Sequence, residues 1–318
     1  MASSIDKRQS GRFYTEGNPF IASPFLSWVQ KNGLNSEEVL EPFAGKNNLV
    51  RALRQVGLAE AFSSFDIQPT DNEVAYRDTL KDFPTGFGFC VTNPPWLARN
   101  SAKRRSLLFP ETEFDDLYKH AVDICLKNCE HVAAIIPATF LQSGLFRDRL
   151  STVIFLHDQS MFVDTENPVC LALFNESSKR VEVFNDDHRI GFLDELEMEL
   201  PPKSDFDVTF NDPQGDLGLI AFDDTRGPSI RFVDGQELSS YKICVSSRMI
   251  TRIGLRVDDV GRLIQTLNED LRSFRKSTCD VFLTPFKGLR KDGYYRRRMD
   301  YRLARDFIAK HANSYTRL

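Results

Sequence analysis

Short apolar runs alternate with amphipathic segments over the first half of this 318-residue chain. Runs rich in β-branched and aromatic residues predict seven strands, over residues 39–45, 61–67, 76–80, 87–92, 131–137, 152–156 and 169–174. Apolar residues at helical spacing predict helices over residues 20–33, 48–57 and 114–127. Strands that alternate with helices in this way favour an α/β fold with a Rossmann-like, largely parallel sheet of seven strands.

The pattern becomes weaker after about residue 177. Residues 176–240 carry many acids, several prolines and glycines, and short alternating runs, which predict strands and loops. An amphipathic helix is predicted over residues 256–277. We therefore expect two domains, with boundaries at residues 1–176 and 177–318.

Composition is typical of a folded protein, because hydrophobic residues make up 41% of the chain. No apolar run approaches ~18 residues and the first ten residues are polar, so we expect neither a membrane span nor a secretory signal. The six cysteines form no CxxC pair, so we expect neither a metal site nor disulfides: Cys90, Cys125, Cys129, Cys170, Cys244 and Cys279. We interpret them as reduced core residues of a cytoplasmic protein.

The net charge of −4 conceals an asymmetry between the two ends of the chain. Residues 241–318 carry 18 Lys and Arg against 8 Asp and Glu, whereas the first 240 residues carry 23 against 37. A basic end on an acidic body predicts a polyanionic partner, and a solvated charged helix is the alternative. Cations interleave with aromatic residues and glycines over residues 284–298, a pattern that suits nucleic-acid contact. The candidate DNA-binding residues are Lys287, Arg290, Lys291, Arg296, Arg297 and Arg298.

The predicted strand over residues 87–92 ends in Asn93-Pro94-Pro95-Trp96. Two prolines cannot continue a sheet ladder, so Asn93 is presented at the carboxyl edge of the strand, where open α/β sheets bind ligands. The Asn93 amide oxygen and the Pro94 carbonyl can accept the two hydrogens of an amino group, and the Trp96 indole can stack on a planar ring. An ordinary turn after a strand is the alternative.

Acidic residues and a glycine follow the first two predicted strands. Gly45 lets the backbone approach a ligand closely, and Asn47 tolerates the left-handed conformation that such a turn needs. Asp66 ends the second strand, 25 residues after Glu41, which is close to the spacing of dinucleotide-binding folds. A carboxylate at this place can accept hydrogen bonds from a ribose diol, whereas a turn or helix-capping aspartate is the alternative.

The Asn-Pro-Pro-aromatic motif after a strand resembles the catalytic motif of amino methyltransferases that use S-adenosylmethionine, a family that includes the adenine-specific DNA methyltransferases. The resemblance covers residues 11–176, and the motif order is that of the gamma arrangement. In that arrangement a Phe-Tyr-Thr segment closes over the methionine end of the cofactor, although Glu16 stands where the pattern usually has proline. The cofactor-binding residues that the resemblance implies are Phe13, Tyr14, Thr15, Glu41, Pro42, Gly45, Asp66, Ile67 and Asp78.

The gamma-type enzymes also have an aromatic residue before the seventh strand, which stacks on the flipped base opposite the aromatic of the catalytic motif. Phe162 stands at this place, so the resemblance implies a base held between Trp96 and Phe162. The chain has 26 phenylalanines, and a core position for Phe162 is the alternative. Residues 97–113 are polar and basic and are long for a connector, so we expect either a phosphate contact or a solvated loop.

The activity that the resemblance implies is methyl transfer to the 6-amino group of an adenine flipped out of double-stranded DNA. Asn93, Pro94, Pro95 and Trp96 would be catalytic, no metal is implied, and residues 177–318 would recognise the target. The same chemistry on RNA adenine or protein glutamine stays open, and so does a catalytically silent DNA-binding subunit. Cytosine is less favoured, because its motif usually begins with Ser or Thr. A restriction endonuclease acting on the same site, and a bacterial or phage origin, are further implications.

Overall fold

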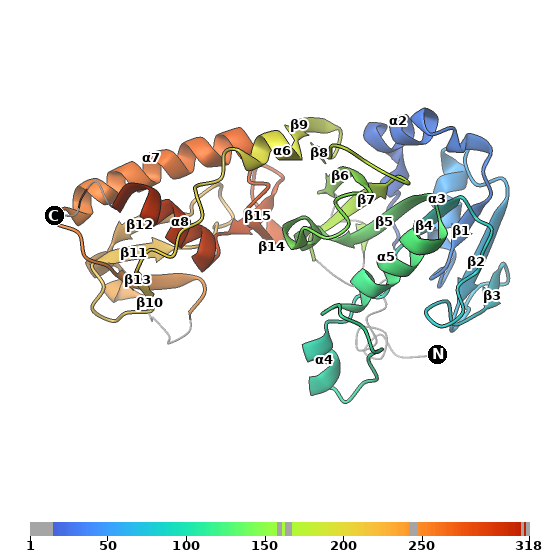
Figure 1. Cartoon of the computed structure of the whole chain (residues 1–318), viewed down its shortest axis with the longest axis horizontal. Coiled ribbons are helices and arrows are strands. Elements are labelled where there is room, and N and C mark those ends of the chain that lie inside the picture. Colours follow the sequence, from blue (N-terminus) through green and yellow to red (C-terminus); the bar gives the residue numbers. More distant parts are fainter. Residues whose placement is uncertain (1–14, 158–160, 163–166, 242–246, 313–314, 316–318) are drawn as a thin grey trace. The chain divides into compact units, whose positions relative to one another are not determined.

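The structure is a computed structural model that describes residues 15–157, 161–162, 167–241, 247–312 and 315. Phe13, Tyr14 and Cys244 of the sequence predictions lie outside these residues. The chain divides into two compact units, Met1–Phe192 and Leu193–Leu318, and each is described by itself (Figure 1).

The first unit is built on a nine-stranded sheet with the order β3-β2-β1-β4-β5-β7-β6-β8-β9. Its strands are β1 (Val39–Glu41), β2 (Phe62–Asp66), β3 (Val74–Tyr76), β4 (Phe89–Thr92), β5 (His131–Pro137), β6 (Leu150–Leu156), β7 (Val169–Phe174), β8 (Glu182–Asn185) and β9 (His188–Phe192). Strands β1 to β5 run parallel, whereas β7 runs antiparallel to β5 and β6. The strand order reverses between β1 and β4, which is the point at which doubly wound sheets bind ligands.

Helices connect these strands within the described part of the first unit. They are α2 (Ser23–Lys31), α3 (Asn48–Gln55), α4 (Arg99–Arg104) and α5 (Leu117–Asn128), with 3-10 turns η1 (Pro19–Ile21), η2 (Leu34–Ser36) and η3 (Ala138–Ser143). Helix α3 packs against β1 and α5 against β5. Every residue of β4 and β7 is buried, which accounts for their continuous apolar runs.

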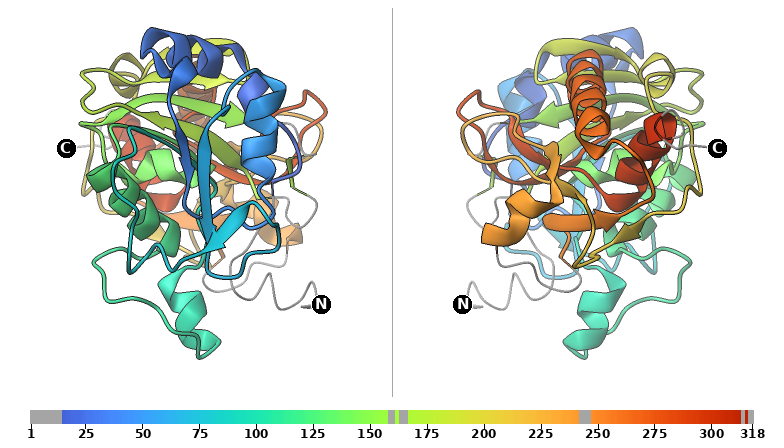
Figure 2. Two further views of the ribbon diagram at one scale, coloured as in Figure 1. Left: turned by 90° about the vertical axis from the view of Figure 1, so that its right-hand side faces the viewer. Right: turned by 90° about the vertical axis from the view of Figure 1, so that its left-hand side faces the viewer.

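The predicted α/β fold is confirmed, and six of the seven predicted strands overlap β1, β2 and β4 to β7. The strand predicted over residues 76–80 was misplaced, because β3 spans Val74–Tyr76 and shares only Tyr76 with it. The sheet is larger than predicted, because β8 pairs in parallel with β6 and β9 pairs with β8. The first unit therefore ends at Phe192, later than the boundary expected at residue 176. Helix α4 lies inside the stretch that we expected to be a connector, and this stretch projects from the sheet in perpendicular views (Figures 1 and 2).

The second unit has an antiparallel sheet of order β10-β13-β11-β12 and a separate hairpin, β14-β15. Its strands are β10 (Thr209–Phe210), β11 (Leu217–Ile220), β12 (Arg231–Asp234), β13 (Ile250–Gly254), β14 (Thr284–Leu289) and β15 (Tyr295–Arg298). Its helices are α6 (Leu193–Glu197), α7 (Val260–Thr278) and α8 (Tyr301–Ala312), and η5 (Gly235–Ser240) is a 3-10 turn. Helix α7, which was predicted, packs on β12 and on α8, which was not. Leu263, Leu267 and Phe274 of α7 join Phe307 of α8 in one apolar core. Within the described residues, no helix is both long and apolar enough to span a membrane.

Candidate active site

A cavity of about 240 Å³ lies where the carboxyl ends of β1, β2 and β4 meet. Nine of the residues predicted from the sequence line it: Thr15, Glu41, Gly45, Asp66, Ile67, Asp78, Asn93, Pro94 and Pro95. Pro42 contacts the site through Thr79, whose Oγ1 donates to the Pro42 carbonyl at 2.7 Å. The fold thus collects residues from five separate stretches of sequence around one cavity.

Asn93 is held in place by Thr15, which precedes η1 and α2. Its Nδ2 donates to Thr15 Oγ1 at 3.1 Å, and Asn48 Nδ2 donates to the Thr15 carbonyl at 2.8 Å. Because Nδ2 is bonded to Thr15, Oδ1 is the atom of this amide that can accept from a ligand. Asn48 was not predicted as a site residue, and its position at the start of α3 is the only sequence signal for it.

The turn after β1 has the backbone that the sequence predicted. Gly45 and Asn47 have positive φ angles of 52° and 60°, so the left-handed conformation expected of Asn47 is confirmed. Asp66 closes the turn, because its Oδ2 accepts from Gly45 N at 2.9 Å and its Oδ1 from Gln68 N at 2.7 Å. Asp66 therefore acts as a turn aspartate in this structure, which was the alternative to a ribose-binding role in the sequence analysis. Each carboxylate oxygen keeps a second lone pair, which a diol in the cavity could use.

Glu41 is a buried carboxyl at the end of β1, with 1% of its surface exposed. Phe43 N donates to its Oε1 at 3.1 Å, and the Thr92 hydroxyl lies close enough to the carboxyl to lower its pKa, although it makes no hydrogen bond of full geometry to the buried Oε2. Burial raises the pKa of Glu41 from 4.5 to about 8, and the nearby Asp66 adds to the increase. A positively charged ligand in the cavity would compensate for this burial.

We expect binding of a cationic ligand to release a proton from Glu41. The empty protein keeps this carboxyl protonated below about pH 8, whereas a nearby positive charge favours the carboxylate, so affinity should increase as pH rises toward 8. Calorimetry with S-adenosylmethionine at pH 7, in two buffers of different ionisation enthalpy, measures the released proton. Glu41→Gln should abolish the release and weaken binding, whereas the exposed Glu37→Gln should change neither. Equal proton release from the parent and from Glu41→Gln would contradict the prediction.

The same pKa shift predicts how stability depends on pH. The Glu41 carboxyl ionises near pH 4.5 in the unfolded chain and near pH 8 in the folded one, so the folded state binds more protons between these values. The ligand-free protein should therefore lose stability as pH rises through this window. Glu41→Gln should flatten that dependence in thermal unfolding measured from pH 5 to pH 8.5.

Trp96 and Phe162, the two aromatic residues expected to hold a base, lie next to each other. Their ring centroids are 5.3 Å apart with an interplanar angle of 67°, and their side chains are 8% and 5% exposed. Phe162 also forms an antiparallel bridge with Thr15, the residue that binds Asn93. The two rings pack edge to face, so a base could enter between them only if they separate.

Two of the six candidate DNA-binding residues were wrongly assigned. Arg290 is 7% exposed and Arg297 is 1% exposed, so neither side chain is available to a partner. The hairpin alternates its faces, and in β15 the outer positions Arg296 and Arg298 are half-buried while Arg297 between them points into the core. Lys287 and Lys291 are exposed, as expected. A triple substitution of Arg296, Arg297 and Arg298 would therefore damage the core as well as any DNA contact.

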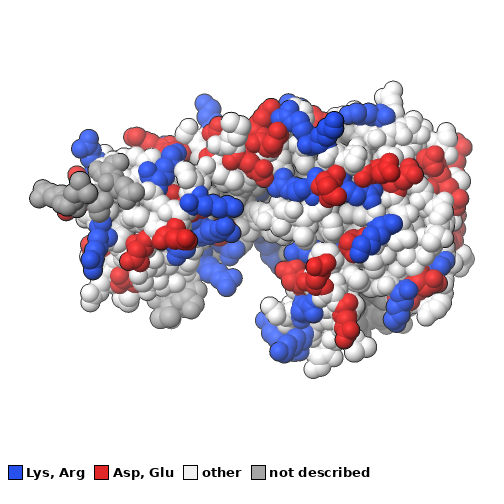
Figure 3. All heavy atoms as spheres, viewed as in Figure 1, with Lys and Arg blue, Asp and Glu red and all other residues white. Residues whose placement is uncertain are grey.

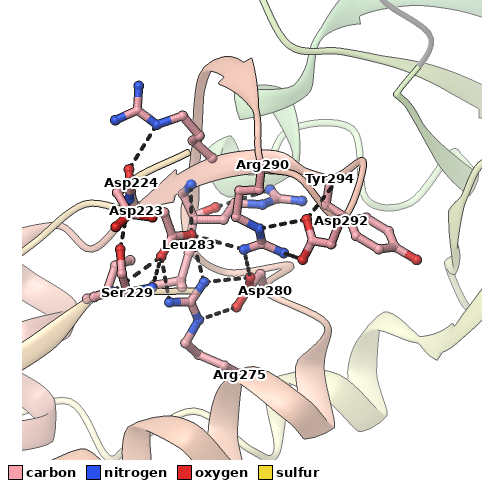
Figure 4. Close-up of polar contacts among 12 residues, drawn as sticks. Asp223, Asp224, Ser229, Arg275, Asp280, Leu283, Arg290, Asp292 and Tyr294 are labelled. Atoms are coloured by element: carbon pink, nitrogen blue, oxygen red, sulfur yellow. Dashed lines mark hydrogen bonds and ion pairs between the residues drawn. The ribbon is translucent and has the colours of Figure 1, made fainter. Parts of the chain in front are cut away.

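Arg290 belongs to a buried network of ion pairs in the second unit (Figure 4). Asp223, with no exposed surface, accepts from Arg275 Nη1 and Nη2, both at 2.8 Å, and from Arg290 Nη1 at 3.0 Å. Asp280 accepts from the same two arginines, and Asp292 pairs with Arg290 at 3.1 Å. These arginines stabilise the unit instead of facing solvent.

Comparison with known proteins identifies similar solved structures. Neither a protein-family model nor a curated protein sequence matches the chain. One is a protein from Listeria monocytogenes that is described as a class I S-adenosylmethionine-dependent methyltransferase. Its sequence is 13% identical to this chain, the TM-score is 0.39, and the match covers 53% of this chain and 64% of that one. The methyltransferase subunit of a type I restriction-modification system from Streptococcus thermophilus is 16% identical with a TM-score of 0.37, covering 59% and 52%. The chain thus spans less than two thirds of the length of each of these two structures.

Proposed function

We propose that this protein transfers a methyl group from S-adenosylmethionine to the 6-amino group of an adenine flipped out of DNA. The observation that supports this most directly is the position of Asn93. Its amide is fixed by Thr15 at the edge of a cavity that also contains the Gly45 turn and the carboxyls of Glu41 and Asp66. An acceptor for an amino group thus borders a site that suits a cationic nucleoside.

The residues around the cavity fit S-adenosylmethionine. The cofactor carries an ammonium, a sulfonium and a ribose diol, and it would supply an electrophilic methyl group when bound. The buried Oε2 of Glu41 would accept from the ammonium, directly or through a water. Asp66 would accept from the diol with the lone pairs that the turn leaves available, and Asp78 would accept from the adenine amine of the cofactor.

The catalytic tip would act by positioning the target amine. Asn93 Oδ1 and the Pro94 carbonyl would accept its two hydrogens, which directs the nitrogen lone pair toward the methyl group. No strong base is required before attack, because the proton can leave after the nitrogen has become cationic. Trp96 and Phe162 would separate and stack on the two faces of the base.

The second unit would contact DNA through its exposed cations. Lys287 and Lys291 on the β14-β15 hairpin are exposed, and the half-buried Arg298 borders a pocket that also contains the exposed Arg248. Contacts of this kind hold the duplex backbone and are independent of sequence. RNA adenine and protein glutamine remain the alternative substrates for the same chemistry.

The proposal is tested by offering radiolabelled S-adenosylmethionine with duplex DNA, RNA and a protein pool in parallel. We expect label in DNA alone, recovered as N6-methyladenine. Label in RNA or protein without label in DNA would refute the choice of substrate. Tight binding of the cofactor without transfer to any acceptor would indicate a catalytically silent subunit.

A further inference from the structure

The stretch between Trp96 and α5 forms a projection with an apolar end, and the proposed function gives this projection no role. It comprises residues 97–116, begins directly after Trp96, and contains α4 (Figures 1 and 2). Leu108 at its tip is 100% exposed and the neighbouring Leu107 is 37% exposed. Their apolar surface is therefore available to a partner.

The two legs of the projection are tied together at its base. Ala98 and Asp116 form an antiparallel bridge, Leu117 N donates to the Leu97 carbonyl at 3.0 Å, and Leu97 N donates to Asp116 Oδ1 at 3.1 Å. The base is therefore a direct continuation of the chain that presents Asn93, and the position of the projection is coupled to the catalytic tip.

The projection is also braced internally. The Arg99 side chain donates to the Thr112 carbonyl and, at 2.6 Å, to the Phe114 carbonyl, and its guanidinium lies 4.8 Å from the ring centroid of Phe109. Ser106 has a positive φ of 54°, and Leu107 N donates to the Ala102 carbonyl at 3.0 Å. The turn that presents the leucines is thus defined by backbone hydrogen bonds.

Basic side chains surround the apolar tip. Lys103, Arg104 and Arg105 are exposed in and after the last turn of α4, next to the leucines. Figure 3 shows basic side chains gathered on this projection beside uncharged atoms. Its acids, Glu111, Glu113, Asp115 and Asp116, belong to the returning leg, and among the described residues neither Lys103 nor Arg104 pairs with a carboxylate. An apolar point flanked by cations matches the chemistry of a duplex, with a base stack between two rows of phosphates.

We propose that this projection is a wedge that enters the DNA duplex when the target adenine leaves it. Leu108, with Leu107 behind it, occupies the place of the extruded base in the stack, and Lys103 and Arg104 contact the phosphates beside it. Apolar side chains of this size insert between base steps in other kinds of DNA-bending protein. The inference rests on the proposed function, since only an enzyme that extrudes a base leaves such a place to fill.

The wedge is tested by binding, without any methyl transfer. One duplex carries 2-aminopurine paired normally at the target position, and a second has an abasic site there, which leaves the stack already open. The parent should bind the abasic duplex about tenfold more tightly than the intact one and should raise the 2-aminopurine fluorescence on the intact one. Leu108→Ala should lose both effects. Met198→Ala, which removes an 83% exposed side chain in the second unit, should lose neither.

A second measurement compares methyl transfer to duplex and to single-stranded DNA. Leu108→Ala should slow transfer to the duplex by about ten- to a hundredfold and leave transfer to a single strand unchanged, because a single strand needs no opening. Equal losses on both substrates, or no loss on either, would overturn the wedge. A parent that binds both duplexes equally would also overturn it. A parent that prefers the abasic duplex but methylates no DNA would contradict the proposed function alone.

Discussion

Asn93→Ala is expected to reduce methyl transfer by about 100- to 1,000-fold while the affinity for S-adenosylmethionine stays nearly unchanged, since losing one preorganised polar contact at a reacting group has effects of this size. In the proposed mechanism the side chain offers its Oδ1 to the target amine, while its Nδ2 donates to Thr15 Oγ1 at 3.1 Å. Truncation removes the acceptor at the reacting nitrogen but leaves the carboxyls of Glu41 and Asp66 in place. Single-turnover kinetics with bound DNA, together with calorimetry of the cofactor, separate the two effects.

A matched control is Asn128→Ala, which truncates an exposed asparagine at the end of α5. It should retain full activity. Thr15→Ala should give an intermediate loss, because the amide of Asn93 keeps its acceptor but loses the contact that orients it. Turnover of Asn93→Ala within a few-fold of the parent would show that this amide does not contact the reacting amine.

The central part of the fold was predictable because its strands are buried on both faces. Strands β4 and β7 consist entirely of buried residues, so they appear in the sequence as continuous apolar runs. Strands β8 and β9 lie at the edge of the sheet, where residues such as Glu182 and His188 are not buried. Their pattern is weaker, and the first unit was therefore predicted to end too early.

The cavity was predictable for a related reason, since parallel strands place their carboxyl ends along one edge. Glu41 and Asp66 each end a strand and Asn93 directly follows β4, so the topology brings them together whatever their distance in sequence. Asn48 and Thr79 could not be predicted in the same way. They line the cavity because each makes a hydrogen bond to a backbone carbonyl that is distant in sequence, Asn48 to Thr15 and Thr79 to Pro42. The spacing of apolar residues along the chain does not reveal such contacts.

Charge alone does not determine whether the cations near the C-terminal end of the chain face a partner or the protein core. A run of cations has the same sequence signature whether it faces DNA or a buried acid, and Asp223 lies 52 residues from Arg275 and 67 from Arg290. Strand alternation does distinguish Arg297 from its two neighbours, because the middle residue of three must face the opposite side.

Asp223→Ala should lower the free energy of unfolding of the second unit by about 3–5 kcal/mol, the range measured when one partner of a buried ion pair is removed. Burial alone would raise the pKa of Asp223, but hydrogen bonds from Arg275 and charge attraction outweigh burial and lower it. Burial would likewise lower the pKa of Arg275, but its bonds to Asp280 and Asp223 raise it. Without Asp223, the Arg275 and Arg290 side chains stay buried with fewer acceptors.

The matched control is Asp224→Ala at the next position, where the carboxylate pairs with the exposed Arg226 and little loss is expected. Denaturant unfolding of both variants, measured beside that of the parent, gives the difference in stability.

The lowered pKa of Asp223 also predicts a pH dependence. Its stabilising contribution is present above the pKa of the unfolded chain, about 3.8, and is lost as pH falls below that value, so the parent and Asp223→Ala should converge in stability in strong acid. Binding of S-adenosylmethionine to the first unit should be unaffected in both variants. Equal stability of Asp223→Ala and Asp224→Ala at pH 7 would mean that the buried arginines do not depend on this carboxylate, and that the neighbouring Asp280 alone is sufficient to neutralise them.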